Sequence, residues 1–444
     1  MVSSAVRSTI LRGSTVRHYA AVAAAAQSCG PAVPECKVLS NKVTIAAYDN
    51  NSPITQVSII FRAGSRNETY DTQGMIHHLR VLAGQSTSRA SGFAITRNIQ
   101  QLGGNLLTVV DRESIAYTLQ ITRNNLNDAL KFLDCVATKQ VFKPWEVSDQ
   151  APRLQYELQS IPDTTRVLEL LHKAAFRRGL GYSLFSPKHQ IGKIGTETLQ
   201  HFVNSWYTAP KCAVVAVGVP LSHITAFASN LEISSEDCAN EASKYHGGEI
   251  RKEKGSNLTN VAVAVEGVNM KNEKDALACA ILQRASSTDP RVKWGNSSSP
   301  LYKQVANAAG TDPFALSTFN ANYTDSGLFG FVLCSTPDIA GPLTKEASKW
   351  LKSMKLSDKD IARGKAILKA EILDAADNES MLLENMQYQA LFKGQISTPA
   401  TLMADVDKVS ASDVQSVAAK LSKGNLSMAA VGNLKTVPYI DELK

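Results

Sequence analysis

The sequence contains no run of about 20 apolar residues, which is the length that a membrane-spanning helix needs. It therefore predicts a chain that does not cross a bilayer itself, although it can associate with a membrane through partner proteins. The seven cysteines are scattered and form neither a C-x-x-C pair nor a Cys/His cluster, so iron–sulfur and haem attachment patterns are absent. We expect the thiols to be small buried hydrophobic groups and the chain to carry no cofactor.

Acidic residues are missing from the first 34 positions, which are rich in arginine, serine and threonine. This composition is typical of a mitochondrial presequence. The tetrapeptide that runs from Arg17 through Tyr19 to Ala20 resembles the cleavage pattern R-x-Y followed by a small residue. We therefore expect residues 1–19 to be a removable presequence and residues 20–36 a flexible stretch, with a flexible basic arm as the alternative.

The charge balance argues against nucleic acid as a partner. The formal net charge is +7, and three of these charges come from the arginines of residues 1–19. The remaining positive charge is small and scattered along the sequence, whereas nucleic-acid-binding proteins gather basic residues on one face. Hydrophobic residues make up 44% and charged residues 20% of the 444 positions, as in ordinary soluble globular proteins. The length suffices for two to three domains.

One octapeptide, Gly74–Val81, resembles a metal-binding signature in which key residues are replaced. In the pattern H-x-x-E-H, two histidines one helical turn apart bind zinc and the glutamate activates water. His77 occupies the first ligand position, Arg80 the position of the glutamate and Val81 that of the second histidine. A guanidinium cannot take a proton from water near neutral pH, and a valine has no lone pair for a metal.

The alternative for this octapeptide is an ordinary amphipathic helix with a packed histidine. His78 does not supply the missing ligand, because neighbouring residues on a helix point about 100° apart. The chain has eight histidines, and none of them completes an H-x-x-E-H motif elsewhere. The weight of the octapeptide therefore depends on the rest of the sequence.

The two halves of the chain show the same order of sequence patterns, which favours the duplication of one unit. Each half predicts strand, strand, helix, helix, strand, strand, long helices, strand. This order indicates an α+β fold of two homologous halves, each with helices packed on one face of a mainly antiparallel sheet. The matching segments are Gln56–Gly64 with Asn260–Gly267, Glu113–Leu119 with Asp325–Phe331, and Val214–Gly218 with Met428–Gly432.

The polar stretch 234–257, which is rich in charge and contains two adjacent glycines, predicts an exposed linker between the halves. Residues 37–233 then form an N-terminal domain and residues 258–444 a C-terminal domain. Each of these domains is long enough to bury a hydrophobic core of its own.

Duplicated α+β halves with an altered H-x-x-E-H segment in the first half resemble the pitrilysin-type (M16) metallopeptidase family. This family includes the mitochondrial processing peptidase subunits and the core proteins of the cytochrome bc1 complex. The resemblance covers roughly residues 37–444 and implies the duplicated fold described above. It is carried by Gly74–Val81, Leu171–Arg177, Tyr323–Phe331, Gly432–Leu434 and Pro438–Leu443.

The resemblance places the zinc site of the family on four residues of this sequence. It matches the first histidine ligand to His77, the catalytic glutamate to Arg80 and the second histidine to Val81. Counting along the chain brings the distal glutamate ligand to Glu157. We therefore expect neither a metal nor a catalytic residue, and we predict that an ion pair between Arg80 and Glu157 replaces the metal. Unrelated surface positions are the alternative for these two residues.

The resemblance implies a catalytically silent scaffold subunit on the matrix side of the mitochondrial inner membrane. Its expected partners are a homologous core subunit and the cytochrome b, cytochrome c1 and Rieske iron–sulfur subunits of a dimeric complex III, which transfers electrons from ubiquinol to cytochrome c. One alternative is a processing-peptidase subunit that binds presequences beside a catalytic zinc partner. Another is a peptide-binding module with a cavity between its halves.

A loop in the second half helps to weigh these alternatives. The non-catalytic processing-peptidase subunit carries a long glycine-rich loop that binds presequences. The corresponding residues 285–300 hold one glycine in this sequence. This difference counts against a presequence-binding role and favours the scaffold.

Overall fold

The computed structural model describes most of the chain after the first 32 residues. The expected presequence, its cleavage region and most of the loop at 285–300 lie outside the described part. The described residues are 33–236, 238–239, 241–287 and 299–443.

Strands from the first half of the chain build one mainly antiparallel sheet. They are β1 (Glu35–Val38), β2 (Thr44–Tyr48), β3 (Ile54–Phe61), β4 (Asn105–Val110), β5 (Ile115–Thr122) and β6 (Cys212–Val217). Their order across the sheet is β1-β2-β6-β3-β5-β4, and of the neighbouring strands only β2 and β6 are parallel. Strand β6 is buried along its whole length, as expected for a strand that is covered on both faces.

Strands from the second half build a second sheet of the same kind. They are β7 (Gly248–Glu253), β8 (Thr259–Glu266), β9 (Phe314–Asn322), β10 (Gly327–Ser335) and β11 (Ser427–Gly432). Their order is β7-β11-β8-β10-β9, and of the neighbouring strands only β7 and β11 are parallel. Strand β11 therefore takes the place that β6 takes in the first sheet. The two mainly antiparallel α+β halves that the sequence predicts are confirmed.

Helices of each half cover one face of its own sheet and enclose a core there. None of the described helices combines the length and the apolar content needed to cross a membrane. The helices of the first half are α1 (Met75–Leu82), α2 (Gly92–Gln101), α3 (Leu126–Thr138), α4 (Pro144–Asp149), α5 (Ala151–Ser160), α6 (Asp163–Phe176), α7 (Thr196–Trp206) and α8 (Leu221–Ser229). Those of the second half are α9 (Glu273–Ser286), α10 (Pro300–Ala309), α11 (Ala340–Ser353), α12 (Asp358–Asp377), α13 (Glu379–Lys393), α14 (Pro399–Lys408) and α15 (Ala411–Leu421).

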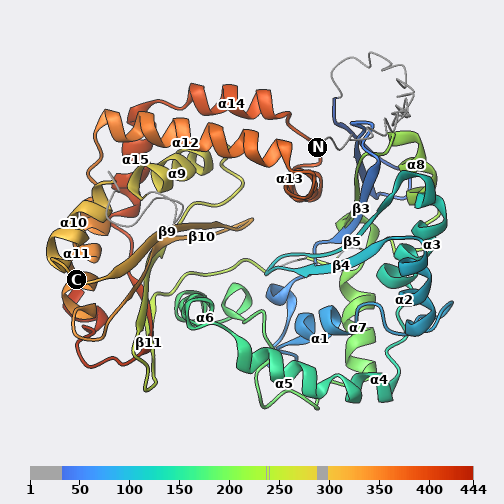
Figure 1. The fold of residues 1–444 in the computed structure, drawn as a ribbon, viewed down its shortest axis with the longest axis horizontal. Helices are drawn as coiled ribbons and strands as arrows, with labels where there is room; N and C mark the ends of the chain where they lie inside the picture. The colour runs from blue at the N-terminus through green and yellow to red at the C-terminus, as the bar shows by residue number, and fades with distance from the viewer. Residues whose placement is uncertain (1–32, 237, 240, 288–298, 444) are drawn as a thin grey trace, which may run out of the picture. The chain divides into compact units, whose positions relative to one another are not determined.

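The opposite face of each sheet is covered by a helix from the other half (Figure 1). Helix α13 packs Leu383 and Met386 against the first sheet, and helix α6 packs Val167 and Leu171 against the second. Because side chains alternate along a strand, a sheet that is covered in this way can be apolar on both faces. One face of each sheet is therefore buried by helices of its own half, as the sequence predicts. The other face is buried by a helix from the other half.

A strand forms inside the stretch 234–257, where the sequence predicts a linker. Strand β7 pairs in parallel with β11 over its six residues, and its side chains are half-buried or exposed. A polar edge strand resembles a linker in composition, because little of its side-chain surface needs to be apolar. Backbone hydrogen bonds to β11 determine the conformation of β7, and the side-chain pattern of the sequence does not predict these bonds.

A buried guanidinium joins the two halves. Arg66 lies in the short 3-10 helix Ser65–Asn67, and its Nη1 donates to Glu113, at 2.5 Å, in the turn between β4 and β5. The same nitrogen donates to the hydroxyl of Thr324, at 3.0 Å, and to Asp325, at 2.9 Å, in the turn between β9 and β10. These turns match one another in the sequence repeat, so one cation connects equivalent turns of the two halves.

Candidate functional site

Helix α1 carries the octapeptide, and the buried carboxyl group of Glu68, whose pKa burial raises to about 8, fixes its first turn. The side chain of Glu68 accepts hydrogen bonds from the backbone N–H groups of Gly74, at 2.8 Å, and Ile76, at 2.9 Å. N–H groups at a helix N-terminus have no partner within the helix, so the oxygens of Glu68 satisfy them. Gly74 has a φ of +91°, and a Cβ at this position would collide with Ser186. Glycine therefore lets the segment around Ser186 approach α1 closely.

His77 is completely buried, and both of its ring nitrogens have partners. The backbone N–H of Ser186 donates to Nδ1 at 3.1 Å, so we assign the ring proton to Nε2. Nε2 then donates to Oε2 of Glu157 at 3.0 Å. Phe185 packs edge-on against the imidazole, with ring centroids 5.6 Å apart. The imidazole is a neutral donor toward Glu157 and keeps no free lone pair for a metal ion.

Glu157, on α5, is the group on which the neighbouring side chains converge. Its Oε2 accepts a hydrogen bond from Nη2 of Arg80 in addition to the one from His77, and its Oε1 accepts one from Nε of Arg153 at 3.1 Å. The ion pair between Arg80 and Glu157 that the sequence predicts is confirmed. We refer to His77, Arg80, Arg153 and Glu157 as the Glu157 cluster.

Burial and charge together set the protonation of the Glu157 cluster. Burial raises the pKa of Glu157, but the hydrogen bonds from His77, Arg80 and Arg153 outweigh it and lower the pKa to about 2. Burial lowers the pKa of His77 to about 4; the charge of Arg80 adds to this shift, and the hydrogen bond to Glu157 opposes it. Near neutral pH the cluster is therefore a carboxylate that is held by two guanidinium groups and one neutral imidazole.

A zinc ion does not fit the side chains of this cluster. Val81 is buried and apolar, Arg80 places a positive charge at the carboxylate, and His77 already uses both of its nitrogens. A catalytic zinc site needs about three protein ligands with available lone pairs. Within the described part of the chain, no group of three His, Cys, Asp or Glu side chains is arranged to hold a metal ion. The arrangement supports hydrogen bonding and charge pairing rather than the activation of water.

Comparison with known proteins agrees with the fold. A family model described as "Insulinase (Peptidase family M16)" matches residues 43–188, and one described as "Peptidase M16 inactive domain" matches residues 193–368. Subunit 2 of the mitochondrial cytochrome b-c1 complex of Homo sapiens is 35% identical over 95% of this chain and 95% of its own length. The chain belongs to peptidase family M16.

Two further M16 relatives are similar along most of the chain. Subunit 2 of the mitochondrial cytochrome b-c1 complex of Rattus norvegicus is 34% identical over 91% of either chain. The probable mitochondrial-processing peptidase subunit alpha-1 of Arabidopsis thaliana is 25% identical over 93% of this chain and 84% of its own length. All three of these relatives are mitochondrial by name.

Two contacts of the Glu157 cluster were not predicted from the sequence, for different reasons. Arg153 lies four residues before Glu157 on α5, and this spacing brings side chains together on a helix. That signal was present in the sequence and could have identified Arg153. Ser186 acts through its backbone N–H, which every residue except proline carries, so no pattern of side chains can identify it.

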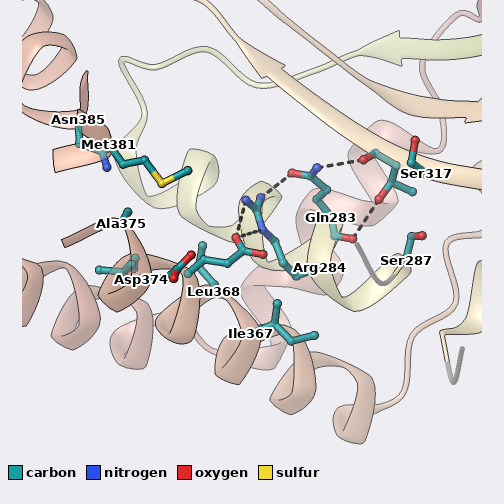
Figure 2. Close-up of a pocket in the computed structure, with 13 residues that line it drawn as sticks. Gln283, Arg284, Ser287, Ser317, Ile367, Leu368, Asp374, Ala375, Met381 and Asn385 are labelled. Carbon is teal, nitrogen blue, oxygen red and sulfur yellow. Dashed lines mark hydrogen bonds and ion pairs between the residues drawn. The ribbon is translucent and has the colours of Figure 1, made fainter. Parts of the chain in front are cut away.

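A separate cavity of about 490 Å³ lies in the second half of this M16 chain, among α9, α12, α13 and β9 (Figure 2). Several of its polar side chains already have partners. Arg284 pairs with Glu371 at 2.9 Å, and the side-chain amide of Gln283 donates to the carbonyl of Thr318 at 3.0 Å. The cavity shares no lining residue with the Glu157 cluster. We assign it no ligand.

Proposed function

We propose that this chain is core protein 2 of the mitochondrial cytochrome bc1 complex (complex III), a scaffold subunit without peptidase activity. The observation that carries the proposal is the ion pair between Arg80 and Glu157. Arg80 stands at the position of the catalytic base, and Glu157 at the position that we assign to the distal zinc ligand. A chain with this pair keeps the M16 fold and gives up the chemistry of the family.

The loss of chemistry follows from the groups themselves. Hydrolysis of a peptide bond at a zinc site needs a metal-bound water and a base that accepts its proton. A guanidinium stays protonated at any physiological pH, so Arg80 cannot be that base. His77 directs an N–H, not a lone pair, toward Glu157. These groups favour a structural role for the cluster, which ties α1 to α5.

The comparisons support the bc1 complex over a processing peptidase. The two relatives named subunit 2 of the cytochrome b-c1 complex are 34–35% identical to this chain, whereas the processing-peptidase relative is 25% identical. This difference favours the scaffold over a subunit that binds presequences.

The proposed partners are the homologous core protein 1 and the cytochrome b, cytochrome c1 and Rieske iron–sulfur subunits of a dimeric complex III. In this proposal the chain lies on the matrix side of the inner membrane, associates with the membrane through these partners and binds no cofactor. Permanent interfaces of such assemblies commonly bury more than ~2,000 Å². Residues 1–19 serve as the removed presequence, and residues 37–233 and 258–444 form the two domains.

The test is to purify the tagged chain from mitochondria in mild detergent and to record its native size and visible spectrum. We expect a large complex with the reduced bands of b-type and c-type haem, because this chain has no haem attachment motif of its own. An Arg80→Gln variant should co-purify the same amount of haem per chain, since the scaffold does not use a catalytic group. A colourless pair with one homologous subunit would contradict the proposal.

The second candidate function is that of a processing-peptidase subunit beside a catalytic zinc partner, and the relative from Arabidopsis thaliana keeps it under consideration. The same purification separates the two candidates. A small, colourless complex that contains zinc and cleaves a presequence peptide would support the peptidase subunit. In that case the zinc should remain with the partner when the two chains are separated.

A further inference from the structure

A cavity of about 500 Å³ lies beside helices α5 and α6 and is lined by both cations and apolar side chains. The segment 177–189 after α6 forms one wall, and Lys252 of β7 contributes to the lining. Its volume is within the range of about 300–1,000 Å³ that is usual for small-molecule sites. Phe185 lines the cavity and also packs against His77, so the Glu157 cluster lies behind this wall.

The rim of the cavity carries positive charge that no described residue neutralises through an ion pair. Among the described lining residues the one carboxylate is Glu169, and it is already paired at 2.5 Å with the buried guanidinium of Arg112. Uncompensated cations in a concave surface attract anions, because the walls focus the field. Four exposed lining cations form no ion pair with any described residue: Lys173, Arg177, Arg178 and Lys252.

The lining also includes an apolar wall, which lies beside the polar side chains of Gln73, Ser183 and His189. Leu158 and Ile161 at the end of α5, Leu170 of α6 and Phe185 are half-buried along the cavity wall. Tyr70, which also lines the cavity, is 73% exposed. Half-buried hydrocarbon next to exposed cations matches a ligand with an anionic head and an apolar tail.

We propose that this cavity binds one anionic phospholipid, with its phosphate at the rim cations and an acyl chain against the apolar wall. A free inorganic anion would leave the apolar wall exposed to water, so it uses only part of the site. An acidic peptide is disfavoured, because the apolar wall offers few partners for the backbone N–H and C=O groups of the peptide. Lipid binding of this kind goes beyond a scaffold role and does not depend on the complex to which the chain belongs.

The test measures binding of soluble lipids to the full chain by titration calorimetry. The probes are dihexanoyl phosphatidylglycerol, dihexanoyl phosphatidylcholine and inorganic phosphate, with the lipids below their micelle concentrations. We expect one phosphatidylglycerol per chain. Phosphatidylcholine, which has no net charge, and phosphate, which has no apolar part, should each bind at least about tenfold more weakly, given roughly fivefold in affinity per cation near an anionic lipid.

The matched variants separate the rim from general surface charge. The rim variant K173Q/R178Q/K252Q should weaken phosphatidylglycerol binding by at least about tenfold. Arg177, the C-cap residue of α6, stays unchanged, so the variant removes three of the four exposed cations. The control variant K355Q/K359Q/K423Q removes three exposed lysines outside the cavity and should bind as the native chain does. Far-UV circular dichroism confirms that both variants are folded.

Three outcomes would overturn the proposal. Equal binding of phosphatidylglycerol and phosphatidylcholine would show that the rim cations do not distinguish an anionic head group from one without net charge. Phosphate that binds as tightly as phosphatidylglycerol would make this a site for free phosphate. An acidic peptide that displaces phosphatidylglycerol from the native chain at a lower concentration than the lipid itself would assign the cavity to a protein partner.

Discussion

Glu113 and Asp325 bind the same guanidinium, that of Arg66, from equivalent turns of the two halves. The junction has further hydrogen bonds: the backbone N–H of Thr324 donates to Glu113 at 3.0 Å, and that of Ser243 donates to Asp325 at 2.7 Å. Both carboxylates are therefore paired with a cation and also accept backbone donors. One arginine thus connects elements that the repeat duplicated, and it does so away from water.

Replacement of Arg66 should destabilise the chain strongly. In the variant Arg66→Met, Glu113 and Asp325 stay close together without their cation. Breaking a buried ion pair by removing one partner costs about 3–5 kcal/mol, because the remaining charge is left uncompensated. We expect a loss of this size in the free energy of unfolding, measured by urea denaturation. The control is Arg89→Met, whose side chain is 57% exposed and lies 3.7 Å from Asp134. It should change stability by less than about 1 kcal/mol, as exposed pairs do.

Rebuilding the H-x-x-E-H pattern should create a zinc site. In the double variant R80E/V81H, the cation beside Glu157 disappears and a second imidazole stands one helical turn from His77. We expect one zinc ion per chain, measured by metal analysis after dialysis against zinc, because zinc binding outweighs the single hydrogen bond from Ser186 that His77 gives up when its ring proton moves from Nε2 to Nδ1. The single variants R80E and V81H are the controls and should each retain much less zinc. Stoichiometric zinc in the native chain would contradict the ligand geometry described for His77 and Glu157.

The stability of the Glu157 cluster should depend on pH in the acidic range. The pKa of Glu157 is about 2 in the folded chain, against 4.5 for a free side chain. A depressed carboxyl pKa stabilises the fold above the unfolded value, and this contribution is lost as pH falls from about 4.5 toward 2. We expect the advantage of the native chain over the variant Glu157→Gln to shrink between about pH 5 and pH 3 in urea denaturation. A constant difference across this range would show that Glu157 does not titrate in this way.

Helices α6 and α13, which each cover the sheet of the other half, should contribute to stability as much as an ordinary hydrophobic core does. Leu171 of α6 and Met386 of α13 are buried against the sheet of the other half. Replacing either one by alanine should cost about 2–5 kcal/mol in the free energy of unfolding, through lost burial and the cavity left behind. The control Leu373→Ala removes a leucine that is 48% exposed on α12 and should stay within about 0.5 kcal/mol. Small effects at Leu171 and Met386 would mean that each half is stable without the helix from the other.

The pairing of Arg80 with Glu157 could be predicted because it required only the local sequence pattern around Arg80 and the position of Glu157 along the chain. The octapeptide is helical in pattern, and the resemblance to a family supplied the distance along the chain to Glu157. The sequence also contained the spacing that joins Arg153 to Glu157 within one helix. It could not indicate Ser186, whose backbone N–H fixes the tautomer of His77, because backbone donors are the same at nearly every position.

The sequence by itself determined the two α+β halves and the replacement of the metal-binding pattern, because periodicity and motif spacing are local properties of the chain. Only the tertiary structure decided that α6 and α13 cover the sheets of the opposite halves, that β7 is a strand, and that Arg66 meets Asp325. The partners in these contacts are far apart in sequence: Arg66 and Asp325 are separated by 259 positions. Contacts of this kind form because the two sheets and their helices bury apolar surface against one another. No local pattern in the sequence indicates which of these surfaces will meet.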